Sequence, residues 1–486
     1  MNIQKYLIWV MCVLQASGLF AQSREILFKE INDQVMAKYN EGDYESIFAR
    51  GKPNYEPHVN VRISSMLLDN LKWKMGKALS SELIADLGDT KYFKWTCKTG
   101  NIRFELRMED TSIISIEFNK LVLQPNALER TPLNNNPLKT KLDSIVDGYA
   151  RIYMSDSSTV GLTIGVYYEG KKNLYYYGEK EKGSGKPVND QTIFSLGSPF
   201  IDGLLARAFV EKKLSPDDDI RKYLGGNFPG LQVKSEPLTL LGLITGKGAP
   251  LFGLITTATN QDSWTKQQWE SALVGYNHDS LLLRDLYTLK LDTLATTRYH
   301  YLMIPSILLC MALEKVYHQS IDQIIRKYYD SAFHMTATKI VADSDDITHY
   351  ATRCDYSGHP IPQKSYYTTS FYPVNSTAPD MMNYVQANVE EQDPAVRLTH
   401  QVIQGDRKSR SRGMGWWIQQ VNGKYERIWQ HGYDPGSNSM WMVYPELKLG
   451  LFLWTNTDST PLNINDVERS IRETILWWNS QNETKN

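Results

Sequence analysis

The sequence has little cysteine, almost no net charge and, beyond its first residues, no long apolar run. Its four cysteines among 486 residues are too few and too scattered for a disulfide framework or a metal site, so we expect Cys97, Cys310 and Cys354 to be buried free thiols. A formal net charge of −1 gives no electrostatic attraction for nucleic acid. The 42% hydrophobic and 22% charged residues are typical of a globular protein with a large core.

The N-terminus is the exception to this absence of apolar runs. A basic start at Met1–Lys5 precedes an apolar run from Tyr6 to Phe20, and Ala21 is a small residue suited to precede a cleavage point. This pattern predicts a secretory signal peptide over residues 1–21 and an exported bacterial protein, periplasmic or extracellular. An uncleaved N-terminal anchor is the alternative. After cleavage we expect no membrane span.

Residues 22–124 are predicted to form a small α+β domain. Helical periodicity is followed by strand signals with turns between them. The predicted helices cover 26–47, with a break at 39–44, and 61–79; the predicted strands cover 92–97, 102–108 and 113–123. This order resembles the cone-shaped domains of the nuclear-transport-factor type, which implies a binding or docking role. The polar, proline-bearing residues 125–137 are interpreted as a linker.

The stretch around Ser198 carries the strongest functional signal. A short apolar run meets Gly197-Ser198-Pro199, and a helical pattern follows as far as Phe209. The pattern predicts that Ser198 begins a helix, with the positive end of the helix beside its hydroxyl. The alternative is a helix cap without catalytic content, because serine at the N-cap followed by proline is common.

This stretch resembles the catalytic-serine segment of the penicillin-recognising serine hydrolases, in the branch of class C β-lactamases, DD-peptidases and related esterases. The family segment reads Phe-x-x-Gly-Ser-x-x-Lys, then a helix, then Lys-Leu-x-x-x-Asp-x-Ile/Val-x-x-Tyr-Leu, which matches the chain through Leu224. One residue departs, because Ile201 stands where the family has its lysine. A serine hydroxyl is a poor nucleophile until a base takes its proton, and isoleucine cannot do so.

A second motif begins at Tyr301. Residues 301–320 align without a gap to the family's Tyr-Ser-Asn, a Leu-Leu helix and a Glu-x-Val-x-Gly-x-Ser turn. The resemblance implies that the Tyr301 phenol would move protons at the serine. The asparagine that holds substrate in the family is Met303 here, and a thioether is a poor hydrogen-bonding group. The alternative for Tyr301 is a tyrosine at a loop-to-helix corner.

A third motif, His431-Gly432-Tyr433, resembles the family's His/Lys-x-Gly strand. In the family this strand edge supplies a backbone N–H of the oxyanion hole. Tyr433 replaces the glycine, which reduces access to the backbone. The alternative for His431 is a lone polar residue in a hairpin, because Asn422-Gly423 just upstream is a strong hairpin signal.

Together the motifs predict an α+β fold for residues 138–486, an antiparallel sheet flanked by helices with a helical lobe, of the β-lactamase/transpeptidase type. The resemblance implies catalytic positions at Ser198, Tyr301 and His431, and binding positions at Gly432, Tyr433, Met303 and Ile201.

With the lysine lost, we expect a catalytically impaired protein that binds a small-molecule, ester or cell-wall peptide ligand in its cleft, without cofactor or metal. Loss of the general base costs serine hydrolases a factor of about 10³ or more. The alternatives are an active serine hydrolase working through an acyl-enzyme on Ser198, and a docking protein that works through its N-terminal domain.

Overall fold

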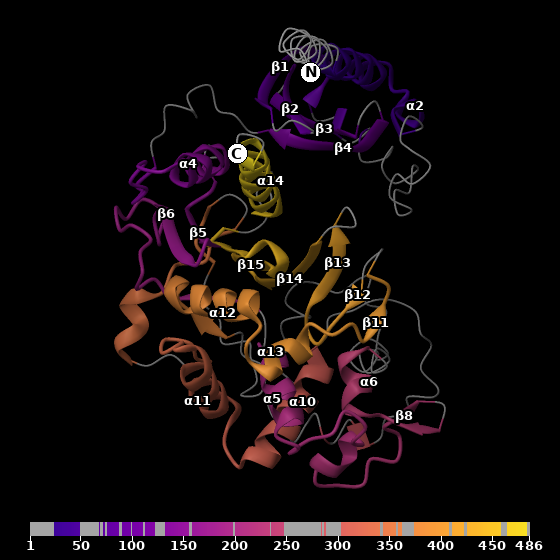
Figure 1. The fold of residues 1–486 in the computed structure, drawn as a ribbon, viewed down its shortest axis with the longest axis vertical. Helices are drawn as coiled ribbons and strands as arrows, with labels where there is room; N and C mark the ends of the chain where they lie inside the picture. Colours follow the sequence, from indigo (N-terminus) through magenta and orange to yellow (C-terminus); the bar gives the residue numbers. More distant parts are fainter. Residues whose placement is uncertain are drawn as a thin grey trace, which may run out of the picture. The chain divides into compact units, whose positions relative to one another are not determined.

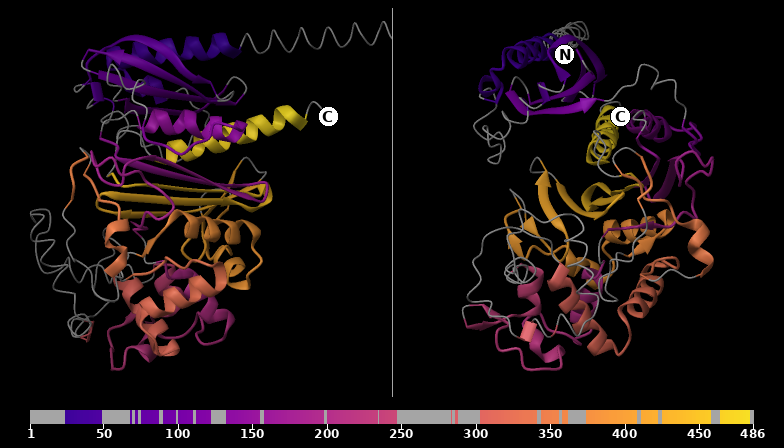
Figure 2. Two further views of the ribbon diagram at one scale, coloured as in Figure 1. Left: turned by 90° about the vertical axis from the view of Figure 1, so that its left-hand side faces the viewer. Right: turned by 180° about the vertical axis from the view of Figure 1, so that it is seen from behind.

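The protein is seen here as a computed structural model (Figures 1 and 2), which groups its residues into two compact units. The first unit comprises residues 1–131, 138–157 and 460–486, and the second comprises 132–137 and 158–459. The structure describes residues 24–48, 68–109, 112–121, 132–154, 158–246, 283–287, 303–340, 344–361, 374–457 and 464–483, with gaps at 69–70, 73–74, 87–89, 99, 198–199, 234, 284–285, 356–357, 408–410 and 422–424.

The N-terminal part of the first unit is a helix-backed antiparallel sheet. Helical residues 24–41 are followed by α2, and four strands pair in the order β1-β2-β3-β4. The bounds are α2 Tyr44–Phe48, β1 Ala78–Asp86, β2 Thr90–Cys97, β3 Gly100–Glu109 and β4 Ser112–Leu121. The predicted helix break and three of the strands are confirmed, and Cys97 is a buried free thiol as expected.

Strand β1 differs from the sequence prediction, which extended a helix through Leu79. The strand begins at Ala78, whose backbone N–H and C=O both bond the side chain of Asn40, each at 2.8 Å. The side-chain amide of Asn40 thus takes the place of a neighbouring strand for both backbone groups of Ala78, which favours extended backbone at this residue. The amphipathic pattern alone could not reveal this long-range contact.

The core of this part is aromatic. Trp95 stacks on Phe104 with ring centroids 4.9 Å apart, and the indole N–H of Trp95 donates to Oδ1 of buried Asn32 at 2.8 Å. Apolar residues of β3 that face this core alternate with charged residues on the opposite face of the strand. The first unit also contains two long helices that pack on each other, α4 Lys141–Met154 and α14 Ile464–Glu483.

The second unit is built on an eight-stranded antiparallel sheet in the order β11-β12-β13-β14-β15-β16-β5-β6. The central strands are buried, which explains their near-continuous apolar sequences. The bounds are β5 Gly161–Tyr168, β6 Lys171–Gly178, β11 Gln404–Gly405, β12 Ser411–Arg412, β13 Trp417–Val421, β14 Tyr425–Asp434, β15 Ser437–Tyr444 and β16 Leu449–Thr455. The predicted antiparallel sheet is confirmed.

Helices of the second unit lie against this sheet and form a lobe beside it (Figure 1). Helix α12 packs on β5 and β16 at two glycines: a Cβ at Gly165 would lie 2.2 Å from the Met382 sulfur, and one at Gly450 would lie 2.3 Å from Val385. The bounds are α5 Asp202–Val210, α6 Leu240–Ile244, α10 Met303–Tyr317, α11 Ile321–Phe333, α12 Ala378–Glu390 and α13 Pro394–Thr399.

Short elements complete the unit: β7 Phe194–Ser195, β8 Gln232–Val233, β9 Glu236–Pro237, β10 Asn375–Ser376, η1 Ile220–Tyr223, η5 Ser344–His349 and η6 Pro445–Leu447.

The turn between α10 and α11 keeps a left-handed residue although its glycine is replaced. His318 adopts a left-handed conformation with φ 52°, at the place where the family motif has glycine, and histidine tolerates that region better than most residues. Ser320 then caps α11 in a capping box with Gln323. Across the described stretches, no helix combines the length and apolar character that membrane crossing demands.

Candidate functional site

The serine-bearing segment lies against strand β14. Strand β7 pairs with β10, and the Leu196 N–H donates to the Val374 carbonyl at 2.8 Å. Two hydroxyls of β15 hold the same segment, because Ser437 donates to the Ser195 carbonyl at 3.1 Å and Ser439 donates to that of Leu196 at 2.6 Å. Residues 195–197 are therefore fixed at the middle of the sheet.

Two glycines allow this close approach. A Cβ at Gly432 would lie 1.4 Å from the Leu196 carbonyl oxygen, and one at Gly197 would lie 2.3 Å from the backbone nitrogen of Tyr433. Gly197 also has φ +62°, a conformation that disfavours any residue with a side chain. Both positions therefore require glycine. The Tyr433 N–H donates to the Gly197 carbonyl at 3.2 Å.

The helix after the serine starts later than the sequence predicts. Helix α5 begins at Asp202 with Ile201 as its N-cap, which has φ −98° and makes no side-chain capping bond. The prediction that the helix begins at Ser198 is therefore wrong. Ile201 precedes the first helical residue and is not part of the helix.

Phe200 explains the delayed helix start. Its backbone has φ 54°, in the left-handed region that a non-glycine residue adopts at a cost of about 1–2 kcal/mol. Its ring stacks on Tyr329 and meets Tyr384 edge-on, both with centroids 4.6 Å apart. The Tyr329 hydroxyl donates to the Phe200 carbonyl at 2.6 Å. Burying this ring turns the chain away from helical geometry just before Asp202.

Of the sequence-predicted site residues, Ile201 lies in the core and is only 2% exposed. His431 and Tyr433 are exposed on one face of β14, with buried Gly432 between them, because alternate strand residues share a face. Ser198, Tyr301 and the side chain of Met303 lie outside the described residues. The structure thus brings His431, Gly432 and Tyr433 together beside Gly197.

Asp202 is a residue of this region that the sequence interpretation did not single out. Burial raises the pKa of its carboxyl to about 6, although its own backbone N–H, the Gln430 amide and the charge of Arg412 act in the opposite direction. A Cβ at Gly415 would lie 2.0 Å from the Asp202 carboxylate, and the Gln430 amide donates to the Gly415 carbonyl at 2.7 Å. An acid in the first turn of a helix is common, so sequence alone gave no reason to choose it.

Asp434 was also missed. It is buried, and its carboxylate pairs with Arg353 at 2.7 Å. The pair ties the end of β14 to the segment that contains Cys354, another buried free thiol, as is Cys310. Within the described ranges, no cluster of three metal-ligating side chains occurs.

The sequence model of the Beta-lactamase family matches residues 145–474. The chain is also similar to a beta-lactamase of Psychrobacter immobilis, with 33% identity over 87 residues, 17% of this chain and 22% of that protein. A beta-lactamase of Pseudomonas fluorescens shows 30% identity over 115 residues, 23% of this chain and 32% of that protein. These matches span about a fifth to a third of the relatives' length.

Solved structures share the fold. A beta-lactamase/D-alanine carboxypeptidase from Pseudomonas syringae has a TM-score of 0.53 at 18% identity, covering 69% of this chain and 99% of that one. A D-alanine carboxypeptidase from Burkholderia cenocepacia has a TM-score of 0.55 at 20% identity, covering 69% and 98%. Three motifs in order, an antiparallel sheet with its helices and a family match over most of the chain lead to one conclusion: this protein belongs to the beta-lactamase family.

Proposed function

We propose that this protein is an exported member of the family that has lost most or all of the acyl-transfer chemistry and retains the site as a ligand-binding surface. The observation that carries this proposal is the backbone path at residues 200 and 201, where Phe200 is left-handed and Ile201 caps α5 with a buried apolar side chain. A general base must stand within hydrogen-bond reach of the proton that it takes. The side chain at position 201 has no basic group, and the residue lies before the first helical residue of α5.

The occupied N–H of Tyr433 supports the same proposal. An oxyanion hole needs backbone donors that point at the reacting oxygen, whereas the Tyr433 N–H donates to Gly197. The side chains of His431 and Tyr433 are exposed on one face of β14. We propose that they contact the ligand.

The ligand class follows from the named relatives, which are beta-lactamases and D-alanine carboxypeptidases. We propose a small β-lactam-like molecule, an ester or a cell-wall peptide that ends in D-alanine. An imidazole and a phenol suit such a ligand, because each offers hydrogen bonds and an apolar ring.

An active serine hydrolase is the second candidate. It is favoured by the two glycines, Gly197 and Gly432, which preserve close contact between the serine segment and β14. In this case Ser198 would form an acyl-enzyme with a base other than residue 201.

One experiment separates the two candidates. The full chain is incubated with a fluorescent penicillin and with an activated ester, beside Ser198→Ala. We expect no covalent label above that of Ser198→Ala, together with saturable non-covalent binding. His431→Ala and Tyr433→Ala should each weaken that binding, while Tyr287→Ala, another exposed tyrosine, should not. Labelling that depends on Ser198 would establish the active hydrolase.

Export rests on the N-terminal pattern of residues 1–21. N-terminal sequencing of protein recovered from the bacterial envelope or medium should begin at Gln22. Soluble cytoplasmic protein that still carries Met1 would argue against export.

A further inference from the structure

Strand β3 has a charged outer face that is nevertheless buried. Its inward residues are Ile102, Phe104, Leu106 and Met108, while Arg103, Glu105 and Arg107 alternate with them and share the opposite face. Glu105 is 0% exposed and Arg103 is 5% exposed. Buried charges are costly unless they are paired, so this face is built for a partner with charges of its own.

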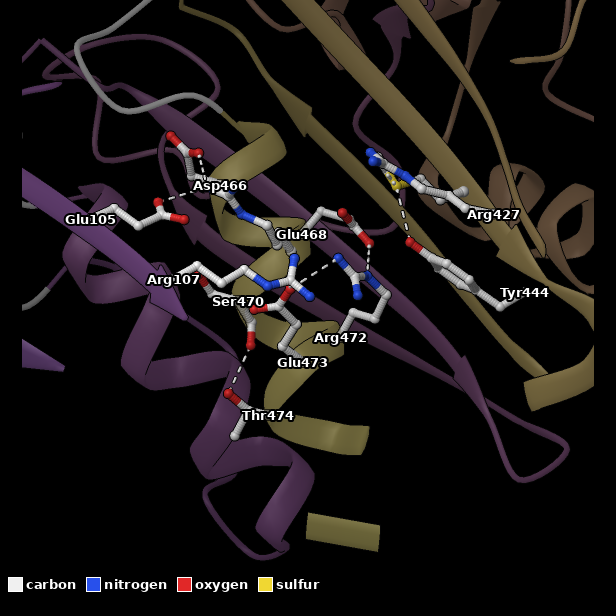
Figure 3. A network of polar contacts seen from close by, with 12 residues as sticks. Glu105, Arg107, Arg427, Tyr444, Asp466, Glu468, Ser470, Arg472, Glu473 and Thr474 are labelled. Atoms are coloured by element: carbon white, nitrogen blue, oxygen red, sulfur yellow. Dashed lines mark hydrogen bonds and ion pairs between the residues drawn. The ribbon is translucent and has the colours of Figure 1, made fainter. Parts of the chain in front are cut away.

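The partner is helix α14, from which Asp466 and Glu473 are labelled in Figure 3. Arg469 of the same helix pairs with this face as well. These residues are spaced three and four apart, so they lie on one face of the helix. Arg103 pairs with Asp466 at 2.8 Å, Arg469 pairs with Glu105 at 2.8 Å, and Arg107 meets Glu473 at 3.6 Å.

The order of charges fixes the register of the helix on the strand. Plus, minus, plus along β3 meets minus, plus, minus along α14, so a shift by one position would place Arg103 against Arg469 and Glu105 against Glu473. An uncharged contact adds to this pattern, because Tyr92 of β2 shares a hydrogen bond of 3.2 Å with the hydroxyl of Ser470. Burial raises the pKa of the Tyr92 phenol, which keeps it a neutral partner.

Strand β3 lies outside the stretch that matches the family, whereas most of helix α14 lies inside it. The family match runs from 145 to 474 and includes most of α14, whereas the four-stranded sheet lies before it. The two solved structures described above match this chain over 98–99% of their own length, and the match uses 69% of this chain. The N-terminal sheet is therefore an addition whose charged face matches an element of the family domain.

We propose that the outer face of β3 is a recognition surface whose partner is the chain's own C-terminal helix α14. The N-terminal domain thus docks within the chain through this face, which is not offered to a separate protein. Any external partner would have to use another surface of the domain. The proposal stands whether or not Ser198 reacts.

The test is charge reversal in the full chain, with hydrogen–deuterium exchange measured by peptide. Glu105→Arg places a guanidinium against Arg469 and should speed exchange about tenfold or more in both β3 and α14, because a buried unpaired charge favours local opening. Adding Arg469→Glu restores an opposite pair and should return both elements towards the wild-type rates. Glu82→Arg, on the exposed edge of the same sheet where Glu82 pairs with Lys94, is the matched control and should leave α14 unchanged.

Exchange in β15 and β16 reports whether the second unit remains folded in each variant. If Glu105→Arg fails to fold, the milder Glu105→Gln should still speed exchange in α14. The proposal would be overturned if Glu105→Arg speeds exchange in β3 alone. It would also be overturned if the double variant exchanges as fast as Glu105→Arg in both β3 and α14.

Discussion

The backbone N–H of Tyr433 donates to the carbonyl of Gly197 across 3.2 Å. This bond joins the serine segment to β14 at the point where the family uses strand-edge N–H groups for catalysis. The close approach of Gly432 to the Leu196 carbonyl supports the same contact between the two segments.

Gly432→Ala tests the tightness of this contact. The added methyl would lie 1.4 Å from the Leu196 carbonyl oxygen, a backbone atom that cannot move alone, so we expect a loss of about 2–3 kcal/mol in the free energy of unfolding. Chemical denaturation measures it. Gly148→Ala, in α4 with nothing within 4 Å, should instead stabilise by about 1 kcal/mol. Equal effects from both variants would contradict this picture.

Ile201→Lys tests whether only the family lysine is missing. Ile201 is buried in the core, so a lysine there would be buried without a partner, and we expect a loss of several kcal/mol and a lower melting temperature. The variant should gain no reactivity towards an activated ester. Ile201→Leu, which conserves volume, should change stability by less than about 1.5 kcal/mol. A stable, reactive Ile201→Lys would show that the site is otherwise intact.

Asp202 predicts a pH dependence of stability. Its pKa in the folded protein is raised from 3.8 to about 6, so the folded state holds the proton more tightly than the unfolded state. The associated stability is fully present below about pH 4 and is lost as pH rises through about 6, amounting to up to about 3 kcal/mol.

Urea denaturation at several pH values measures this contribution. Asp202→Asn should remove the decrease in the free energy of unfolding between pH 4 and 6. The same change at exposed Asp217 should leave this decrease in place. An unchanged slope in Asp202→Asn would assign the pH dependence to other groups.

The connector at residues 125–137 predicts a specific proteolysis result. Protease should cut between Leu123 and Leu138, on the N-terminal side of Pro132, because the sequence is polar there. Residues Leu133 and Asn135 are instead hydrogen-bonded to strand β6. If β3 recognises α14, the two fragments should still elute together in size-exclusion chromatography at low salt. In Glu105→Arg the fragments should separate. A chain that resists cleavage throughout this stretch would argue against a linker.

The sequence predicted the repeating parts of the fold well. Strands β2, β3 and β4 were placed within two residues at each end, since their sequence pattern is local. The start of β1 was missed, because it depends on Asn40 far along the chain. The start of α5 was missed for a similar reason, because Phe200 is held by Tyr329 and Tyr384.

At the candidate site, the sequence identified the motif residues but not their supporting groups. His431 and Tyr433 share a face because strand alternation is regular. Asp202 and its contact with Gly415 depend on a loop and a helix that meet only in the folded chain. The charged face of β3 was not identified from the sequence, because the burial of its charges depends on the helix opposite it.

The left-handed Phe200 has a consequence for folding kinetics. Its ring is held by residues of α11, α12 and β15, which follow it by more than a hundred positions. A strained conformation that is supported by such distant ring contacts gains this support only after the loops between them have closed. We therefore expect the serine segment to reach its native shape late, after the helical lobe and the central strands have assembled around the place its aromatic ring will fill.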